Sequence, residues 1–229
     1  MDKTLSLIKN VPIFSGLNEA ELNNIRQIAV HKQYDKGENI FFQDDEAKGF
    51  YLIIEGLVKV FKSSSEGKEQ ILHIFGPGEP FGEVAVFAGA SFPAYASALS
   101  KISTLFFPRS LFVNLISANP SLAMNMLSVL SMRLRQLTTQ IENLTLKEVP
   151  ARVAAYLIYL AEEQQNNKIV TLKISKGSLA GLLGTIPETL SRIFARLNEQ
   201  NLIEVNGRNI KLIDFTGLQE LTEYGKKIE

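Results

Sequence analysis

Polar side chains that could read DNA recur at helical spacing between residues 185 and 197. Glu188, Arg192 and Arg196 are four residues apart, so a helix would place all three on one face. From such a face an arginine can donate to guanine O6 and N7 in the major groove, and a glutamate can accept from cytosine N4. The sequence therefore predicts a recognition helix. The residues that we expect to contact DNA are Glu188, Thr189, Ser191, Arg192, Arg196, Lys176 and Arg208.

The residues around this helix predict a helix-turn-helix. Residues 175–183 form a short segment with helical apolar spacing, and Gly184 suits the positive φ that ends a helix. Pro187 falls in the first turn of the next helix, where its missing N–H leaves no hydrogen bond unmade. The apolar residues of that helix repeat as one stripe, which we expect to be buried: Leu190, Ile193, Phe194 and Leu197.

Glu188 has a second possible role. Thr185-Ile-Pro-Glu188 fits the pattern of a capping box, in which Glu188 would accept from the backbone N–H of Thr185. The sequence leaves both roles open, and we favour the one in which Glu188 contacts a DNA base.

A hairpin is expected after the helix-turn-helix. Segments 203–205 and 210–213 are strand-like and flank Asn206-Gly207, two residues that tolerate positive φ. A helix-turn-helix followed directly by a hairpin is a winged helix. Between Leu172 and Leu212 six lysines and arginines stand against three glutamates, a modest excess that a dimeric, site-specific DNA binder could use. The residues expected at phosphates are Lys176, Arg196 and Arg208.

The N-terminal half has the pattern of an antiparallel sheet. From about residue 30 to 107, short β-rich runs such as 50–54 and 70–75 alternate with glycine-containing turns. This spacing predicts a small antiparallel barrel or roll. We expect a helix at 19–28 before it, capped by Asn18.

One long helix is predicted from about residue 120 to 147. Its apolar residues alternate in steps of four and three as a heptad seam: Ala123, Leu127, Leu130, Leu134, Leu137, Ile141 and Leu144. A seam this narrow indicates a partner helix, and a homodimer is its simplest source. A second stripe, Leu122, Met126 and Val129, could face the roll.

Composition excludes several classes of function. The 229 residues carry no net charge and no cysteine, so an iron–sulfur cluster, a zinc–thiolate site and a disulfide switch are excluded. No run of about 18 apolar residues or signal peptide is present, and we expect a cytoplasmic protein without membrane contacts. His31 and His73 are the two histidines available as ligands.

The order of roll, long helix and winged helix resembles the Crp/Fnr family of bacterial transcription regulators over nearly the whole chain. The segments that carry the likeness are 51–60, 78–83, 186–192 and 202–207. The resemblance implies an α+β protein with an effector-sensing β-roll domain (1–118), a dimerisation helix (119–147) and a winged-helix DNA-binding domain (148–229). It also implies a homodimer that binds double-stranded palindromic operator DNA with TTGA-type half-sites, and RNA polymerase as a partner.

The effector that this resemblance implies is not cyclic AMP. In cyclic-AMP-binding members a Gly-Glu pair is followed by Arg-Ser, whose arginine neutralises the cyclic phosphate. Here Gly82-Glu83 is present, but Pro93-Ala94 stands at the Arg-Ser positions. The Thr-Ser pair that reads adenine in those members corresponds to Leu137-Thr138. A buried phosphate without a cation would lose several kcal/mol. We therefore interpret Glu83 as a structural carboxylate at a turn.

The chain is instead similar to the cysteine-free branch that senses nitric oxide and nitrosative stress, the Dnr-like and HcpR-like regulators. Segments 87–98 and 187–192 carry this likeness. Members of this branch are thought to bind haem in the roll, which makes His73, and secondarily His31, the candidate axial ligand. A histidine on such a strand can equally be an ordinary core residue.

Two other functions fit the sequence less well. An enzyme that uses the roll as a regulatory module is disfavoured, because the sequence holds no nucleophile–base pair, HExxH motif or phosphate-binding glycine loop. A scaffold without DNA binding would have no reason to expose both Glu188 and Arg192 on one face.

Overall fold

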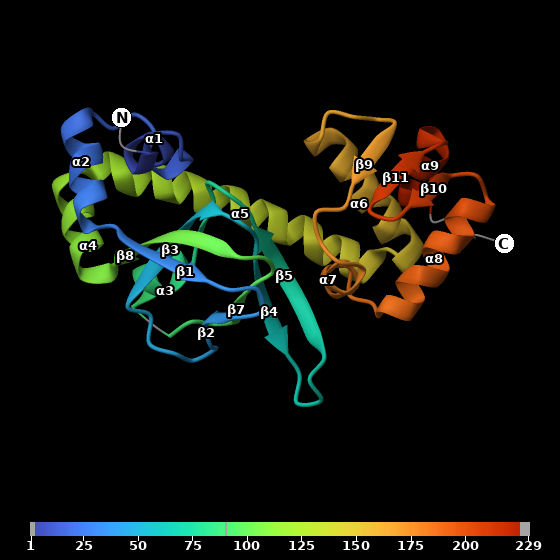
Figure 1. Ribbon diagram of the computed structural model, residues 1–229, viewed down its shortest axis with the longest axis horizontal. Helices are drawn as coiled ribbons and strands as arrows, with labels where there is room; N and C mark the ends of the chain where they lie inside the picture. Colours follow the sequence, from blue (N-terminus) through green and yellow to red (C-terminus); the bar gives the residue numbers. More distant parts are fainter. Residues whose placement is uncertain (1–2, 90, 225–229) are drawn as a thin grey trace. The chain divides into compact units, whose positions relative to one another are not determined.

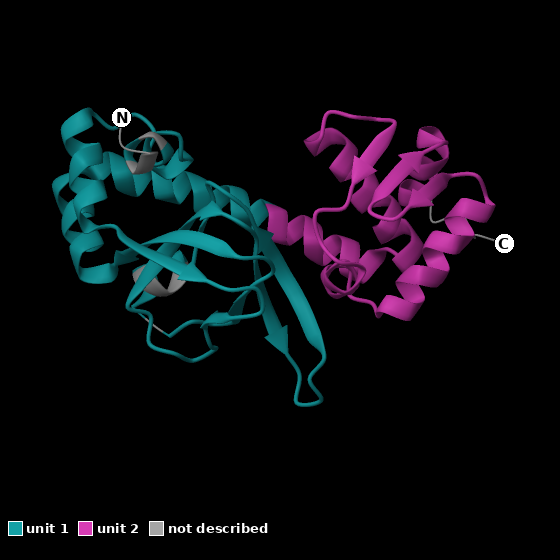
Figure 2. Ribbon diagram, in the orientation of Figure 1, with its two compact units in different colours: residues 1–135 teal, residues 136–229 magenta. Residues whose placement is uncertain are grey.

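The computed structural model describes residues 3–89 and 91–224, which divide into two compact units, 1–135 and 136–229 (Figure 2). The first unit contains two antiparallel sheets with helices at one side, and the second contains a helix-turn-helix with a small sheet (Figure 1). The α+β class, with a β-roll, a long helix and a C-terminal winged helix-turn-helix, is thereby confirmed. Within the described chain no helix is both long and apolar enough to cross a membrane.

Each sheet of the first unit has four strands. The first sheet has the order β1-β8-β3-β6 and the second the order β2-β7-β4-β5. The bounds are β1 (Val30–Tyr34), β2 (Asn39–Phe41), β3 (Gly49–Glu55), β4 (Val58–Ser63), β5 (Glu69–Phe75), β6 (Pro80–Phe81), β7 (Tyr95–Ala98) and β8 (Ile102–Pro108). A short helix α3 (Glu83–Ala88) lies between β6 and β7.

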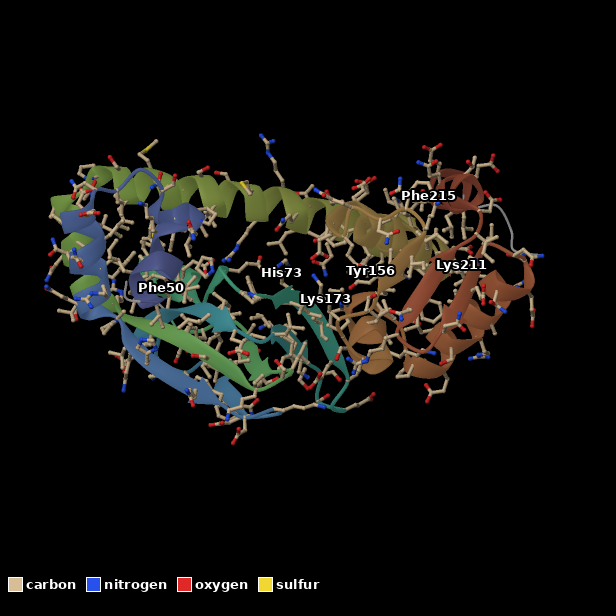
Figure 3. The ribbon with its side chains drawn as sticks, turned by 45° about the horizontal axis from the view of Figure 1, so that its top comes forward. Phe50, His73, Tyr156, Lys173, Lys211 and Phe215 are labelled. Carbon is tan, nitrogen blue, oxygen red and sulfur yellow. The ribbon has the colours of Figure 1, made fainter. Side chains whose placement is uncertain are left out.

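Strand β3 reads as an unbroken apolar run because both of its faces are buried. Phe50 and Leu52 belong to a core shared with the helices, whereas Tyr51 and Ile53 belong to the interior of the roll. The sheet with β3 therefore separates two cores, and Phe50 marks the helical one (Figure 3).

Glycines occupy both ends of β3. A Cβ on Gly49 would collide with the carbonyl oxygen of Phe107 on the neighbouring strand. At the other end Gly56 has φ 92°, and a Cβ there would lie 2.5 Å from the carbonyl oxygen of Lys101. The backbones approach so closely at these two positions that no side chain fits.

Helices cover the outer face of this sheet. They are α1 (Lys3–Lys9), a 3₁₀ turn (Pro12–Phe14), α2 (Glu19–Ile28), α4 (Arg109–Ala118) and the first half of α5 (Pro120–Leu146). Asn18 caps α2 in a full capping box with Glu21, which confirms the predicted cap. The stripe of Leu122, Met126 and Val129 packs into the helical core, as expected.

The second unit begins within α5. A break follows α5, and Pro150 lies in the first turn of α6, where its missing N–H leaves no helical hydrogen bond unmade. The other elements are α6 (Val149–Glu163), β9 (Ile169–Thr171), α7 (Lys176–Leu182), α8 (Pro187–Glu199), β10 (Ile203–Asn206), β11 (Asn209–Leu212) and α9 (Phe215–Tyr224). The three strands form an antiparallel sheet of order β10-β11-β9.

Candidate nucleic-acid interface and effector site

The turn between α7 and α8 has the predicted geometry. The side chain of Ser175 accepts from the backbone N–H of Ser178 at 3.0 Å and caps α7. Gly184 has φ 64°, and the next N–H, that of Thr185, donates to the carbonyl oxygen of Ala180 at 2.9 Å. This bond closes the C-terminal end of α7 and starts the chain toward α8.

Helix α8 has one buried and one exposed face. Its apolar stripe is 0–7% exposed, and its members are Leu190, Ile193, Phe194 and Leu197. Glu188, Ser191, Arg192 and Arg196 are exposed on the other side. Thr189 is half-buried and accepts a long hydrogen bond, 3.5 Å, from Nη2 of Arg192. The helix therefore presents the predicted reading residues to solvent.

The capping alternative for Glu188 is wrong. The N-cap of α8 is Ile186, which makes no side-chain cap bond, and Glu188 is the second residue of the helix. The N–H of Thr185, which a capping box would use, already donates to Ala180. Gly184 bends the chain so that this N–H closes α7, and the Glu188 carboxylate stays exposed at the helix start.

The basic residues between Leu172 and Leu212 fall into two groups. Lys173 pairs with Glu163 at 2.7 Å and Lys211 pairs with Glu204 at 3.6 Å, so both have a carboxylate partner (Figure 3). The other group is exposed on α7, α8 and the hairpin: Lys176, Arg192, Arg196 and Arg208. The ammonium of Lys176 lies 5.6 Å from the Phe194 ring.

The hairpin differs from the expected one by a single residue. Asn206 still pairs with Asn209, so the two turn residues are Gly207 and Arg208. Positive φ is required at Gly207, where it is 65°, but not at Asn206, whose amide donates to Glu204 at 3.2 Å. This register places Arg208 at the tip of the wing. Strand β9 was not predicted, because three residues after a polar loop give too short a pattern.

Sequence reasoning also missed Arg152 on α6. Its Nη1 donates to the carbonyl oxygen of Leu183 at 2.6 Å, and its Nε donates to that of Lys147 at 3.1 Å. Burial lowers the pKa of this guanidinium from its usual value. Arg152 thus ties the segment between α5 and α6 to the turn of the helix-turn-helix, and nothing in the local sequence signals these partners.

Glu83 is buried at the start of α3 and pairs with Arg133 of α5. Arg133 also donates to the carbonyl oxygen of Pro80, and its guanidinium lies 4.8 Å from the centroid of the Phe75 ring. Burial lowers the pKa of Arg133 to about 10, although the charge of Glu79 opposes this shift. Within the described residues Oε2 of Glu83 has no hydrogen-bond partner. The interpretation of Glu83 as a turn carboxylate missed this partner from α5, 50 residues later in the chain.

The other predicted effector residues divide between the two units. Gly82 has φ 77° and precedes α3. A Cβ on Gly82 would lie 3.1 Å from the Phe92 ring and 3.4 Å from the Phe41 ring. Pro93 is exposed, and Ala94 is buried. Leu137 and Thr138 are exposed on the part of α5 that belongs to the second unit.

His73 lies on β5, where a bulge at Leu72 interrupts the regular pairing with β4 (Figure 3). Its side chain is 36% exposed, its ring lies 4.4 Å from the Phe75 ring, and its Nε2 lies 3.8 Å from Oε1 of Glu79. Burial alone would raise the pKa of Glu79. The nearby His73, the hydrogen bond from the Gly76 N–H and the charge of Arg133 lower it instead.

The described residues offer no ready metal cage. His31 is exposed on β1, and no group of three histidine, aspartate or glutamate side chains could hold an ion in the part of the chain that the structure describes. Two clefts of about 390 and 400 Å³ open in the first unit. Neither is lined by His73, Glu83 or Pro93.

Much of the predicted seam on α5 is solvent-exposed in the single chain. Leu127, Leu134, Leu137 and Ile141 are exposed, while Ala123, Leu130 and Leu144 are partly buried. Large apolar side chains at this spacing leave a continuous stripe uncovered.

Comparison with known proteins gives two family matches. Residues 31–119 match the cyclic nucleotide-binding domain, and residues 151–221 match the Crp-like helix-turn-helix domain. The chain is 29% identical over 214 residues to the "Cyclic AMP receptor protein" of Thermus thermophilus, covering 93% of this chain and 98% of that protein. It is 30% identical over 185 residues to the "cAMP-activated global transcriptional regulator CRP" of Haemophilus influenzae, covering 79% and 82%.

A solved structure agrees with these matches. FixK2 from Bradyrhizobium japonicum superposes with a TM-score of 0.75 at 26% identity, over 85% of this chain and 97% of that one.

Proposed function

Since the chain belongs to the Crp/Fnr family of transcription regulators, we propose that it binds palindromic operator DNA as a homodimer and responds to a small effector in its β-roll. The observation that carries the DNA-binding part is α8, with its apolar stripe buried and Glu188, Arg192 and Arg196 exposed together. An exposed polar face on the second helix of a helix-turn-helix is the surface that enters the major groove.

The proposed half-site resembles TTGA. Arg192 would donate to guanine, Glu188 would accept from cytosine on the opposite strand, and Ser191 would contact the neighbouring position. Thr189 supports this arrangement, because it accepts from Arg192 on the same face. Lys176, Arg196 and Arg208 would contact phosphates.

A mobility shift with duplex DNA tests this function. We expect a palindrome of two TTGA half-sites, spaced by one helical turn, to bind at least about 10³ times more tightly than a scrambled duplex at the same salt concentration. Equal affinity for the two duplexes would contradict sequence-specific binding.

We propose that the seam on α5 is the dimer interface, because each seam residue would meet its own copy across a two-fold axis. The proposed partner beyond DNA is RNA polymerase. The proposed physiological signal is nitrosative stress, which rests on the likeness of segments 87–98 and 187–192 to the Dnr-like and HcpR-like branch.

Cyclic AMP should bind no better than at about millimolar concentration. Pro93 supplies no cation, and the nearby Arg133 is already engaged with Glu83 and the carbonyl oxygen of Pro80. Isothermal titration calorimetry with cyclic AMP checks this expectation. A micromolar dissociation constant would contradict it and would direct attention to Arg133, which a Glu83→Gln variant would release.

Haem is the cofactor that the family likeness suggests, with His73 as its ligand. The residues around His73 do not fit this group: Nε2 faces Glu79, the ring lies against Phe75, and His73 lines neither described cleft. Haem is therefore not part of the function that we propose.

An absorption spectrum after addition of haem, with and without nitric oxide, decides this point. A Soret band that shifts with nitric oxide in the wild type and is lost in His73→Ala would support haem. A spectrum equal to that of free haem would direct the search to an organic effector.

A further inference from the structure

An isoleucine occupies the N-cap of α8, where a polar residue is expected. Serine, threonine, asparagine and aspartate stabilise an N-cap, because their side chains accept from the first free N–H groups of the helix. Ser175 does so for α7, and Asn18 does so for α2. Ile186 makes no side-chain cap bond, and isoleucine is among the residues least suited to this position. The start of α8 therefore forgoes a stabilisation that α2 and α7 both have.

The side chain of Ile186 is also open to solvent. It is 47% exposed, although the apolar stripe of the same helix is buried. A single exposed isoleucine is ordinary on a protein surface. Here, however, the exposed apolar side chain stands at a position that favours a polar one, so it departs from two local preferences at once. Departures of this kind concentrate at functional sites.

Ile186 lies where a recognition helix meets the edges of bases. The N-terminal residues of such a helix are those that contact bases in the major groove. Ile186 directly precedes α8 and is two residues from Glu188, so the Cα atoms of the two residues are at most about 7 Å apart. That distance corresponds to about two base-pair steps of 3.4 Å. The side chain of Ile186 is therefore within reach of the base pairs next to the one that we assign to Glu188.

We propose that Ile186 contacts the 5-methyl group of a thymine and thereby selects thymine at one position of the half-site. Among the groups that base edges present in the major groove, this methyl group is the apolar one, and the others donate or accept hydrogen bonds. The inference rests on the proposed DNA function. In a TTGA half-site every thymine, on either strand, lies within two base pairs of the guanine–cytosine pair and so within the reach of Ile186.

Mobility shifts with uracil in place of thymine test this contact. Deoxyuridine pairs with adenine as thymidine does and lacks only the 5-methyl group. Each thymine of the half-site, on either strand, is replaced in turn and symmetrically in both halves of the palindrome. At one position the wild type should lose about fourfold in affinity for each half-site, hence about fifteenfold for the palindrome, because one buried methyl group is removed from each contact. No loss at any position overturns the proposal.

Ile186→Ser removes the apolar side chain and supplies the missing cap. At the sensitive position the ratio of the affinities for thymine and uracil should fall from about fifteen to about one. The gained cap bond and the lost apolar contact act on folding in opposite directions, so the midpoint of thermal unfolding should stay within about 4 °C of the wild type. A ratio that stays near fifteen overturns the proposal. Ile186→Asn, which also suits an N-cap, takes the place of the serine variant if that variant does not fold.

Ile213→Ser is the matched control. Ile213 is 49% exposed, follows β11 and lies outside the helix-turn-helix, so this variant should keep the full ratio. An equal fall of the ratio in both variants overturns the proposal. Equal affinity of the wild type for the operator and a scrambled duplex would contradict the proposed function itself. Specific binding of the operator without any response to uracil would overturn only the contact of Ile186 with thymine.

Discussion

Leu134→Glu and Leu137→Glu should each convert the protein to monomers and abolish operator binding. Both leucines lie on the α5 seam and are 67% and 44% exposed in the single chain. In a two-fold dimer each substitution would place two glutamates opposite each other in an apolar interface, where unpaired charges are costly. A monomer binds only one half-site. Because its DNA-binding domain is no longer joined to a second one, operator affinity should fall by about 10²–10⁴-fold.

Analytical ultracentrifugation and a mobility shift on the same samples measure the two effects. Met132→Glu is the matched control: Met132 is exposed on the same helix but lies on the side away from the seam. Met132→Glu should stay dimeric and bind DNA as the wild type does. A dimeric Leu134→Glu variant would place the interface on another surface.

Arg192→Ala should cost roughly 1–3 kcal/mol of binding free energy on the specific site and relax the preference at one guanine. The guanidinium is exposed on α8, and its contact with Thr189 is a long one that DNA can replace. Competition among duplexes with single base changes measures this effect. For Arg192→Ala, replacement of that one guanine should no longer weaken binding, whereas changes at the other positions should weaken it as they do for the wild type.

Glu188→Gln tests the contribution of Glu188 to base recognition separately from that of Arg192. The carboxylate caps no helix, so the substitution should leave the thermal stability unchanged. It replaces an acceptor with a mixed donor and acceptor and should therefore weaken discrimination at the cytosine.

Arg208→Gln, at the wing tip, is the control. This variant should weaken binding to all DNA sequences alike. It should also reduce, by about one, the magnitude of the slope of log binding constant against log salt concentration. Unchanged discrimination in Glu188→Gln would remove Glu188 from the set of reading residues.

The elements that the sequence predicted are those whose signals are local. The apolar stripe of α8, the Asn18 cap and the stripe through Leu122 and Met126 each lie within one helix, so spacing alone locates them. The turn of the wing was predicted one residue too early in the chain, because asparagine and glycine both tolerate positive φ. Only the pairing of Asn206 with Asn209 shows that Asn206 belongs to the strand.

The interactions that the sequence could not predict join distant segments. Arg133 reaches Glu83 across 50 residues, and Arg152 reaches the carbonyl oxygen of Leu183 across 31. A charged residue on a helix is usually solvated, and its spacing does not indicate which buried group it will meet. The bulge at Leu72 is similar, because one extra residue in a strand leaves no regular mark on its hydrophobic pattern.

The two buried faces of β3 raise the question of what fixes its pairing. In a strand with one apolar face, a slip of one residue would expose the core residues, and the hydrophobic pattern alone forbids it. In β3 such a slip would exchange Phe50 and Leu52 for Tyr51 and Ile53, one apolar set for another. The register of β3 is fixed instead at Gly49 and Gly56, where the carbonyl oxygens of Phe107 and Lys101 leave no space for a Cβ. A shift in either direction would bring a larger residue against these oxygens, so the correct alignment is the one that steric exclusion at both ends permits.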